Sequence, residues 1–238
     1  MYFLLSGEGV TDMGSCADGA PACDSENYNF GPMAVLVSQI IEAVHNYCFT
    51  ETGHFGFVSE SALASRASEL KAVKKRLGLP GAKTKKETRY FFNNARVMAR
   101  FANEKAAELG DEVVAVLFRD SDGTASADRG LWERKRQSMI QGFAEEQLAR
   151  GVAMVPKPKS EAWILFALKY NYQKAEALEN RSGNDHSPNN LKDELEAHAG
   201  QLLREDLNEL ISSRQVDFEK MDMPSFQAFK ADLEKAIG

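Results

Sequence analysis

The chain lacks any long hydrophobic run and contains few cysteines. No apolar segment reaches the roughly 18 residues that a membrane-spanning helix needs, and no basic stretch precedes the first apolar residues as it would in a signal peptide. Its three cysteines, an odd number, predict no disulfide framework and suit a reducing compartment. We therefore expect a cytoplasmic protein that makes no contact with a membrane.

Positive charge is absent from the first quarter of the chain. Residues 1 to 65 contain eight acidic side chains and no lysine or arginine, whereas residues 66 to 105 hold twelve basic side chains against three glutamates. A basic segment of this kind attracts polyanions, although a basic helical face is also a common form of plain solvated surface. The side chains we select as nucleic-acid-binding residues are Lys74, Lys75, Arg76, Lys83, Lys85, Lys86 and Arg89.

The 238 residues are 43% hydrophobic and 27% charged, which is ordinary for a globular chain with a buried core. Short apolar runs alternate with amphipathic segments, an order that predicts an α/β fold with a parallel sheet flanked by helices and a C-terminal helical extension. We place the α/β domain at residues 1–170, with a basic helical segment at 60–109, and the extension at 171–238.

Hydrophobic periodicity and turn residues locate the expected elements. Strands are expected at residues 2–6, 55–58, 113–118 and 152–155. Helices are expected at residues 33–46, 60–77, 87–109, 131–150, from 161 onward, 188–212 and 225–237. Ser160 and Ser187 are the predicted N-caps of two of these helices, because serine accepts a hydrogen bond from a free helical amide. Residues 13–32 show no periodicity and predict a long loop.

The most informative segment is the apolar run 113–118, which leads into Asp120-Ser121-Asp122. Six apolar residues without a polar interruption are typical of a central strand of a parallel sheet, buried on both faces. Ligands of such sheets bind beyond the carboxyl ends of the strands, so the two aspartates are placed for a metal ion or a phosphate ester. A plain turn is the alternative, because Asp, Ser and Gly favour turns.

Two further strand ends supply carboxylates. Glu8 and Asp12 follow the first strand, and Glu161 follows the fourth. If these strands are parallel neighbours, their acids meet at one edge of the sheet. Hard oxygen ligands favour Mg²⁺ or Mn²⁺, and two such ions about 3.5–4 Å apart can bind both reacting oxygens of a phosphodiester. Lys159, next to this edge, is the expected cation that stabilises charge on the phosphate.

These motifs resemble those of the Toprim domains found in topoisomerases, primases, OLD-type nucleases and small ribonucleases. The matching segments are GEGVTD at 7–12, DSD at 120–122, PKSEAWIL at 158–165 and SPNNLK at 187–192. The last two are similar to stand-alone bacterial Toprim-like proteins of the RloB kind, which are linked to phage defence. The resemblance spans about residues 1–195, and it departs from the family at Thr124, where a third acid is usual.

The resemblance implies a role for each matched acid. Glu8 would be a metal ligand and an acid or base, and Asp120 and Asp122 would be metal ligands, with Asp12 and Glu161 as additional ligands. The implied activity is a metal-dependent nuclease that serves in antiviral defence. Its implied partners are DNA or RNA and an ATPase protein, and the sequence leaves open a homo-oligomer.

Two other functions fit parts of the sequence. The segment DSDGT at 120–124 also resembles the nucleophile motif of haloacid-dehalogenase-like phosphatases, in which Asp120 would attack phosphorus and Asp122 would protonate the leaving group. That motif sits halfway along the chain, and the reading leaves Glu8 and Glu161 without a role. The second alternative is a non-catalytic module that binds nucleic acid or a partner protein and holds a structural ion.

Overall fold

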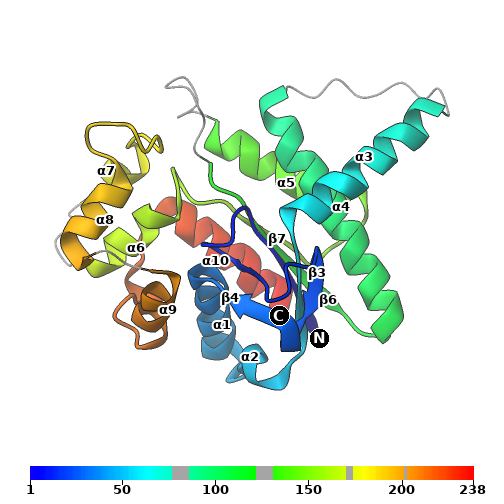
Figure 1. Ribbon diagram of the computed structural model, residues 1–238, viewed down its shortest axis with the longest axis horizontal. Helices are drawn as coiled ribbons and strands as arrows, with labels where there is room; N and C mark the ends of the chain where they lie inside the picture. The colour runs from blue at the N-terminus through cyan, green and yellow to red at the C-terminus, as the bar shows by residue number, and fades with distance from the viewer. Residues whose placement is uncertain (77–85, 122–130, 170–173, 201–202) are drawn as a thin grey trace.

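A five-stranded sheet forms the centre of the protein in a computed structural model that describes residues 1–76, 86–121, 131–169, 174–200 and 203–238 (Figure 1). The strand order is β3-β5-β1-β6-β7. Four strands are parallel, and the edge strand β3 runs antiparallel to β5. The strands are β1 (Tyr2–Ser6), β3 (Ala22–Asp24), β5 (Phe55–Val58), β6 (Val113–Phe118) and β7 (Gly151–Met154). The α/β class is confirmed, although the sheet is mixed and not wholly parallel.

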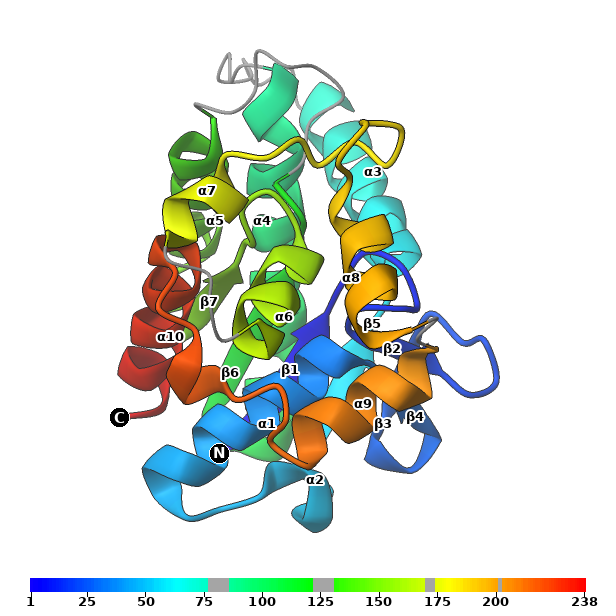
Figure 2. The same cartoon turned by 90° about the vertical axis from the view of Figure 1, so that its left-hand side faces the viewer.

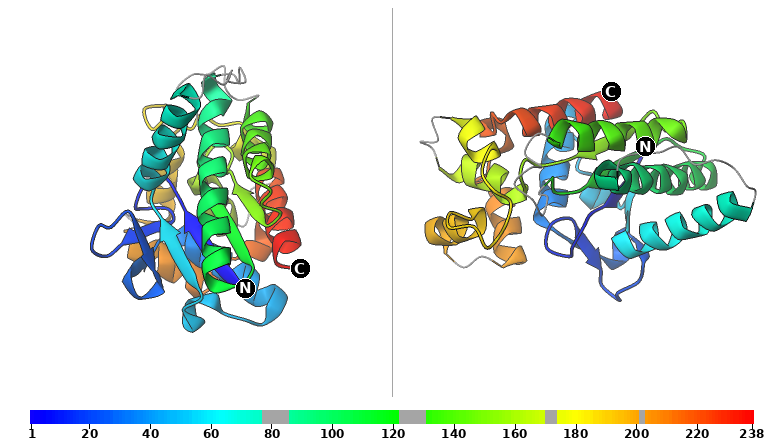
Figure 3. Two further views of the ribbon diagram at one scale, coloured as in Figure 1. Left: turned by 90° about the vertical axis from the view of Figure 1, so that its right-hand side faces the viewer. Right: turned by 90° about the horizontal axis from the view of Figure 1, so that it is seen from above.

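Helices cover both faces of this sheet. Three lie on one face, as Figure 3 shows from that side, namely α3 (Glu60–Arg76), α4 (Lys86–Leu109) and α5 (Trp132–Glu145). The other face carries α1 (Pro32–His45) and α10 (Pro224–Ile237). In β6, Val114 and Val116 pack into the α1 side and Ala115 and Leu117 into the α4 side, because successive side chains alternate. The strand is therefore buried on both faces, as predicted.

The remaining helices are short. They are η1 (Ser25–Asn27), α2 (Phe49–Thr52), α6 (Ser160–Leu168), α7 (Ala175–Glu179), α8 (Leu191–Ala199), α9 (Arg204–Ser212) and η3 (Phe218–Lys220). Figure 2 shows α6, α8 and α9 grouped on one side of the molecule, where α6 packs on α8 and α9 packs on α1. Among the described residues, none of the helices is both long and apolar enough to cross a membrane.

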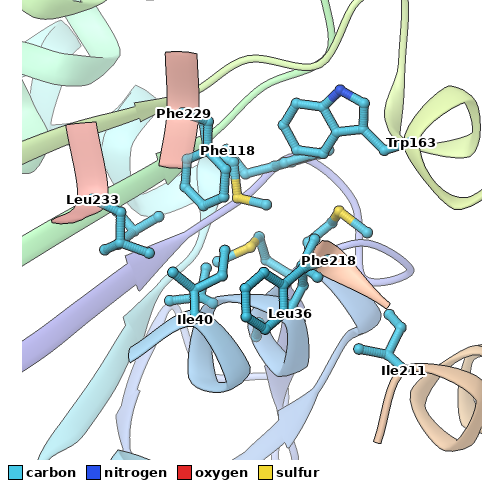
Figure 4. Packing of buried hydrophobic residues seen from close by; sticks show 14 of the residues in the cluster. Leu36, Ile40, Phe118, Trp163, Ile211, Phe218, Phe229 and Leu233 are labelled. Atoms are coloured by element: carbon cyan, nitrogen blue, oxygen red, sulfur yellow. The ribbon is translucent and has the colours of Figure 1, made fainter. Parts of the chain in front are cut away.

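The hydrophobic core continues from the sheet into the C-terminal helices. Figure 4 shows Phe229 and Leu233 of α10 beside Phe118 of β6, with Trp163 of α6 at the same cluster. Trp163 is fully buried, its ring stacks on Phe229 at a centroid distance of 5.7 Å, and its Nε1 donates to Ser225 Oγ at 2.9 Å. The predicted domain boundary at residue 170 stays a prediction, and one core spans it.

The predicted loop at residues 13–32 is wrong, because the segment contains three short strands. β2 (Gly14–Cys16) pairs with β4 (Tyr28–Phe30), and β3 lies between them in sequence and joins the main sheet. Cys16 and Cys23 form a disulfide, contrary to the expectation of no disulfide, and Cys48 is free. Strands of three residues are too short to show an alternating pattern. Backbone pairing with β4 or β5 and the disulfide hold them in place.

Three predicted helix boundaries are also wrong. The helix expected at 131–150 ends at Glu145. Ser160 is the first residue of α6 and its N-cap is Lys159, so the serine hydroxyl is not used for capping. The helix expected from residue 188 begins at Leu191, because Asn190 is the cap whose side chain accepts the Asp193 amide at 2.7 Å.

Candidate active site at the carboxyl edge of the sheet

A tight turn after β1 positions the first two acids. Gly7 has room for no side chain, because a Cβ there would lie 2.4 Å from the Met13 side chain, which is fully buried. The chain therefore folds closely over the end of β1 and returns with Asp12 beside the sheet edge. Glu8 points toward the neighbouring strand, where its Oε1 accepts the backbone N–H of Asp120 at 2.8 Å.

Asp120 lies between the segments that follow β1 and β7. Its amide donates to Glu8, and its own Oδ1 accepts the amide of Ser160 at 3.1 Å. The next residue, Ser121, is anchored by its amide and its hydroxyl, which both donate to the Pro158 carbonyl at 3.1 Å. These bonds fix the end of β6 against the loop that leads into α6.

Ser160 joins the acids from all three strand ends. Its hydroxyl donates to Asp12 Oδ1 at 2.8 Å and lies 3.3 Å from Glu161 Oε2, while its amide contacts Asp120. The side chain is buried. The structure thus brings Asp12, Asp120 and Glu161 together around one serine, with Glu8 one hydrogen bond further away. Asp122 lies outside the described residues.

Asp12 has an unusual protonation behaviour. Burial raises the pKa of this carboxyl group, the hydrogen bond from Ser160 opposes the shift, and the nearby charge of Glu161 adds to it, so that the pKa rises to about 6. At pH 6 a substantial fraction of this carboxyl group is therefore protonated, whereas an ordinary aspartate is ionised at that pH. A group with this pKa can serve as a general acid or base if a substrate lies within reach.

Lys159 is a buried cation held by two carboxylates. Its Nζ lies 3.4 Å from Glu161 Oε1 and donates a hydrogen bond to Asp185. Burial lowers the pKa of Lys159, but Glu161 and Asp185 outweigh this effect and the net pKa is raised. Lys159 consequently stays protonated and can stabilise negative charge, but it cannot act as a base at neutral pH.

A cavity of about 360 Å³ opens over this cluster. The acids of the sheet edge line it together with residues of α8 and α9, which contribute Lys192, Glu196 and Arg204. Its charged and polar lining includes Asp12, Asp120, Lys159, Ser160, Glu161, Asp185, Lys192 and Arg204. A cavity lined by both carboxylates and cations suits a ligand that combines a metal ion with phosphate.

The oxygen donors at the edge suit a hard cation such as Mg²⁺ better than zinc, because carboxylates supply them and sulfur or imidazole does not. Within the described ranges, no three His, Cys, Asp or Glu side chains are grouped closely enough to hold a metal ion by themselves. Mg²⁺ is commonly bound by one or two carboxylates and completed by water and substrate phosphate. One or two of the carboxylates of Asp12, Asp120 and Glu161 fit that partial ligand set.

Of the predicted nucleic-acid-binding residues, only Arg89 can be placed by both its helix and its exposure. Lys83 and Lys85 lie outside the described residues, and for Lys74, Lys75, Arg76 and Lys86 the structure gives the helix position alone. Arg89 is exposed in the first turns of α4. Figure 1 shows the start of α4 and the end of α3 at the upper side of the molecule, toward which β6 runs. The end of α3 and the start of α4, which carry these basic residues, therefore lie on the side of the molecule toward which β6 runs.

Sequence reasoning missed several residues of this site. In the sequence, Ser160 also fits a helix cap, and Asp185 lies in a loop without hydrophobic periodicity. In comparisons with family models, curated proteins and solved structures, none matches this chain.

Proposed function

We propose that this protein is a Mg²⁺- or Mn²⁺-dependent phosphodiester hydrolase that acts on DNA or RNA. The observation that carries the proposal is the meeting of Asp12, Asp120 and Glu161 around Ser160, at the wall of a cavity that also presents Lys159 and other cations. One or two of the carboxylates of Asp12, Asp120 and Glu161 would hold the ion, and water and substrate phosphate would complete its ligands. When bound, such an ion supplies a water molecule of lowered pKa and a positive charge near the reacting phosphate.

The side chains themselves have separate roles in this proposal. Lys192 and Arg204 line the same cavity as the acids and would bind the phosphate oxygens of the substrate. Lys159 keeps a fixed positive charge that would stabilise charge developing on phosphorus-bound oxygens. Asp12 would bind the cation as a carboxylate, so its raised pKa predicts that metal binding weakens as the pH falls below about 6. Glu8 holds the Asp120 backbone and so positions that carboxylate.

The wider role rests on the family resemblance of the sequence motifs. We propose on that ground that the hydrolase is an effector of bacterial antiviral defence and acts with an ATPase partner. The structure supports the phosphatase alternative less well, because Glu8 and Glu161 lie within one or two hydrogen bonds of Asp120 and a nucleophilic Asp120 gives them no role.

The decisive experiment compares Asp120→Asn with Asp222→Asn on labelled single-stranded and duplex DNA and RNA, with and without Mg²⁺ or Mn²⁺. Asp222 is an exposed aspartate away from the cavity and serves as the control. We expect Asp120→Asn to lower cleavage by a factor on the order of 10² or more, while its circular dichroism spectrum is unchanged. Asp222→Asn should cleave like the parent protein.

Three results would argue against the proposal. The first is a wild-type protein that neither binds either metal nor cleaves any of the four substrates. The second is an Asp120→Asn variant that loses its fold together with its nucleic-acid binding, which indicates a structural role. The third is hydrolysis of phosphate monoesters without diester cleavage, which favours the phosphatase chemistry.

A further inference from the structure

Two cations are buried on the α4 side of the same sheet edge. Arg119, which directly follows β6, is 0% exposed, and Lys135 of α5 is 4% exposed. In the part of the chain that the structure describes, neither side chain forms an ion pair with a carboxylate. A buried charge without a counter-charge is strongly unfavourable, so its presence requires an explanation.

The hydrogen bonds of Arg119 leave much of its guanidinium unused. One terminal nitrogen donates to the Phe118 carbonyl at 2.6 Å, whereas Nε and Nη2 have no acceptor among the described residues. The group lies 5.8 Å from the centre of the Tyr90 ring. Lys135 has one acceptor, the Ser121 carbonyl at 2.8 Å, and lies 5.7 Å from the Phe91 ring. Contacts with aromatic rings offset only part of the missing interactions.

Two more polar groups on this face lack partners within the described ranges. The Ser6 hydroxyl and the Asn94 Nδ2 are buried and form no hydrogen bond. Ser6 is the register partner of Leu117, two residues before Arg119, so both side chains face α4. Asn94 lies one turn after Tyr90 on the same helix. Hydrogen-bond donors without acceptors therefore accumulate where β1, β6 and α4 meet.

We propose that these donors form a second site, which binds a phosphate group. A guanidinium with two free N–H groups matches two phosphate oxygens, and the amide and hydroxyl groups supply further donors. Access requires the Tyr90 ring, which is 39% exposed and hydrogen-bonded to Glu60, to turn away from Arg119. The buried charge is then neutralised by the ligand.

The source of the phosphate follows from the chain direction at the end of β6. Arg119 contacts Tyr90 on the α4 side, and the next residue, Asp120, contacts Ser160 on the α6 side. Because Arg119 and Asp120 are adjacent in the chain, a backbone phosphate held by Arg119 would place a polynucleotide beside the acidic site. This step rests on the proposed function, and it makes Arg119 a positioning residue for a neighbouring nucleotide of the substrate.

The test uses Arg119→Met and a matched control, Arg134→Met. Arg134 is exposed on α5, so its substitution removes the same charge at a surface position. Thermal stability is measured against inorganic phosphate and against chloride at equal ionic strength. Binding of a short single-stranded oligonucleotide is measured by fluorescence anisotropy in EDTA, which makes the readout independent of metal and of cleavage.

We expect phosphate to stabilise the parent protein and Arg134→Met but not Arg119→Met. Without phosphate, Arg119→Met should be at least as stable as the parent, because it removes an unpaired buried charge. Its oligonucleotide dissociation constant should rise about 10- to 100-fold, the effect of losing hydrogen bonds to a charged group. Arg119→Lys keeps the charge but loses the planar pair of N–H donors. Its dissociation constant should therefore rise less, at unchanged stability.

The proposal is overturned if phosphate stabilises the parent protein and Arg119→Met equally. It is also overturned if Arg119→Met unfolds while Arg119→Lys binds phosphate and oligonucleotide like the parent, since the charge is then structural. Stabilisation by phosphate with unchanged oligonucleotide binding would assign the site to free phosphate and reject the polynucleotide contact. A parent protein that fails to cleave nucleic acid contradicts the hydrolase proposal and leaves these binding outcomes decisive for the second site.

Discussion

Glu146 shows how a single half-buried carboxylate joins two helices. It follows α5 and accepts hydrogen bonds from two arginines of α4, from Arg96 Nε at 2.9 Å and from Arg100 Nη2 at 3.1 Å. Burial by itself raises the pKa of Glu146. The hydrogen bonds and charges of Arg100 and Arg96 outweigh that effect, and the net pKa lies below the ordinary 4.5.

This pKa makes a prediction about stability against pH. Because the folded pKa is lowered, the stabilisation by Glu146 is present above the ordinary glutamate pKa and is lost as the pH falls through the folded value. At pH 7, Glu146→Gln should lower the free energy of unfolding by about 1–3 kcal/mol, as measured by urea denaturation. The difference from the parent protein should shrink below pH 4.5.

Glu145→Gln, at an exposed neighbouring position, should change neither the stability at pH 7 nor its dependence on pH. A Glu146→Gln deficit that stays constant down to acid unfolding would contradict the assignment.

Single residues also show what the sequence could and could not reveal about the site. Asp120 and Glu8 could be selected because acids directly after apolar runs are visible in sequence, and their strands are neighbours. Ser160 and Arg119 could not be assigned their contacts in the same way. The role of Ser160 depends on Asp12, 148 residues away, and that of Arg119 on a ring of another element. Such contacts follow from tertiary packing, which local pattern does not specify.

At the scale of elements, the packing of α4 on α5 depends on Gly142. A Cβ at this position would lie 2.5 Å from the Phe92 carbonyl oxygen and 2.8 Å from the Ala95 Cβ. Both are on α4, so the two helices approach each other at a distance that no side chain permits. The contact is made with backbone, which cannot move aside as a flexible side chain can.

Gly142→Ala should therefore destabilise the protein, although alanine favours a helix over glycine by about 1 kcal/mol. Overpacking of a close contact costs about 1–3 kcal/mol, which outweighs the gain in helix propensity. We expect a net loss of stability in urea denaturation, whereas Gln141→Ala, at an exposed position one residue earlier, should be neutral or slightly stabilising. An increase in stability for Gly142→Ala would show that the two helices can separate without cost.

Among the elements, length decided which could be predicted. The 24-residue helix α4 is long enough to show its helical periodicity, and β6 is an unbroken run of six apolar residues, so the sequence predicts both to within a residue. β2 and β4 have three residues each, and their position depends on pairing with each other and on the nearby disulfide. Helix starts were misplaced where two candidate caps lie close together, as Ser187 and Asn190 do.

At the scale of the whole molecule, α10 closes the core over β6 and β7. Phe226, Phe229, Leu233 and Ile237 are all buried in the cluster that includes Phe118. Each such side chain contributes about 1.5–3 kcal/mol on burial, so together they contribute roughly 6–12 kcal/mol. That amount is comparable with the total stability of an ordinary domain, about 5–15 kcal/mol.

A fragment of residues 1–170 should consequently fail to fold as an independent unit, even though the sequence motifs place the α/β domain there. We expect it to lack a cooperative urea transition and to be cleaved rapidly by protease, because the α1 side of its sheet exposes apolar surface. In the full chain, Phe229→Ala should cost about 3–5 kcal/mol and leave a cooperative transition. Phe226 and Phe229 would then act as parts of one core together with the sheet. A fragment with the same cooperative unfolding as the full chain would instead establish residues 171–238 as a separate extension.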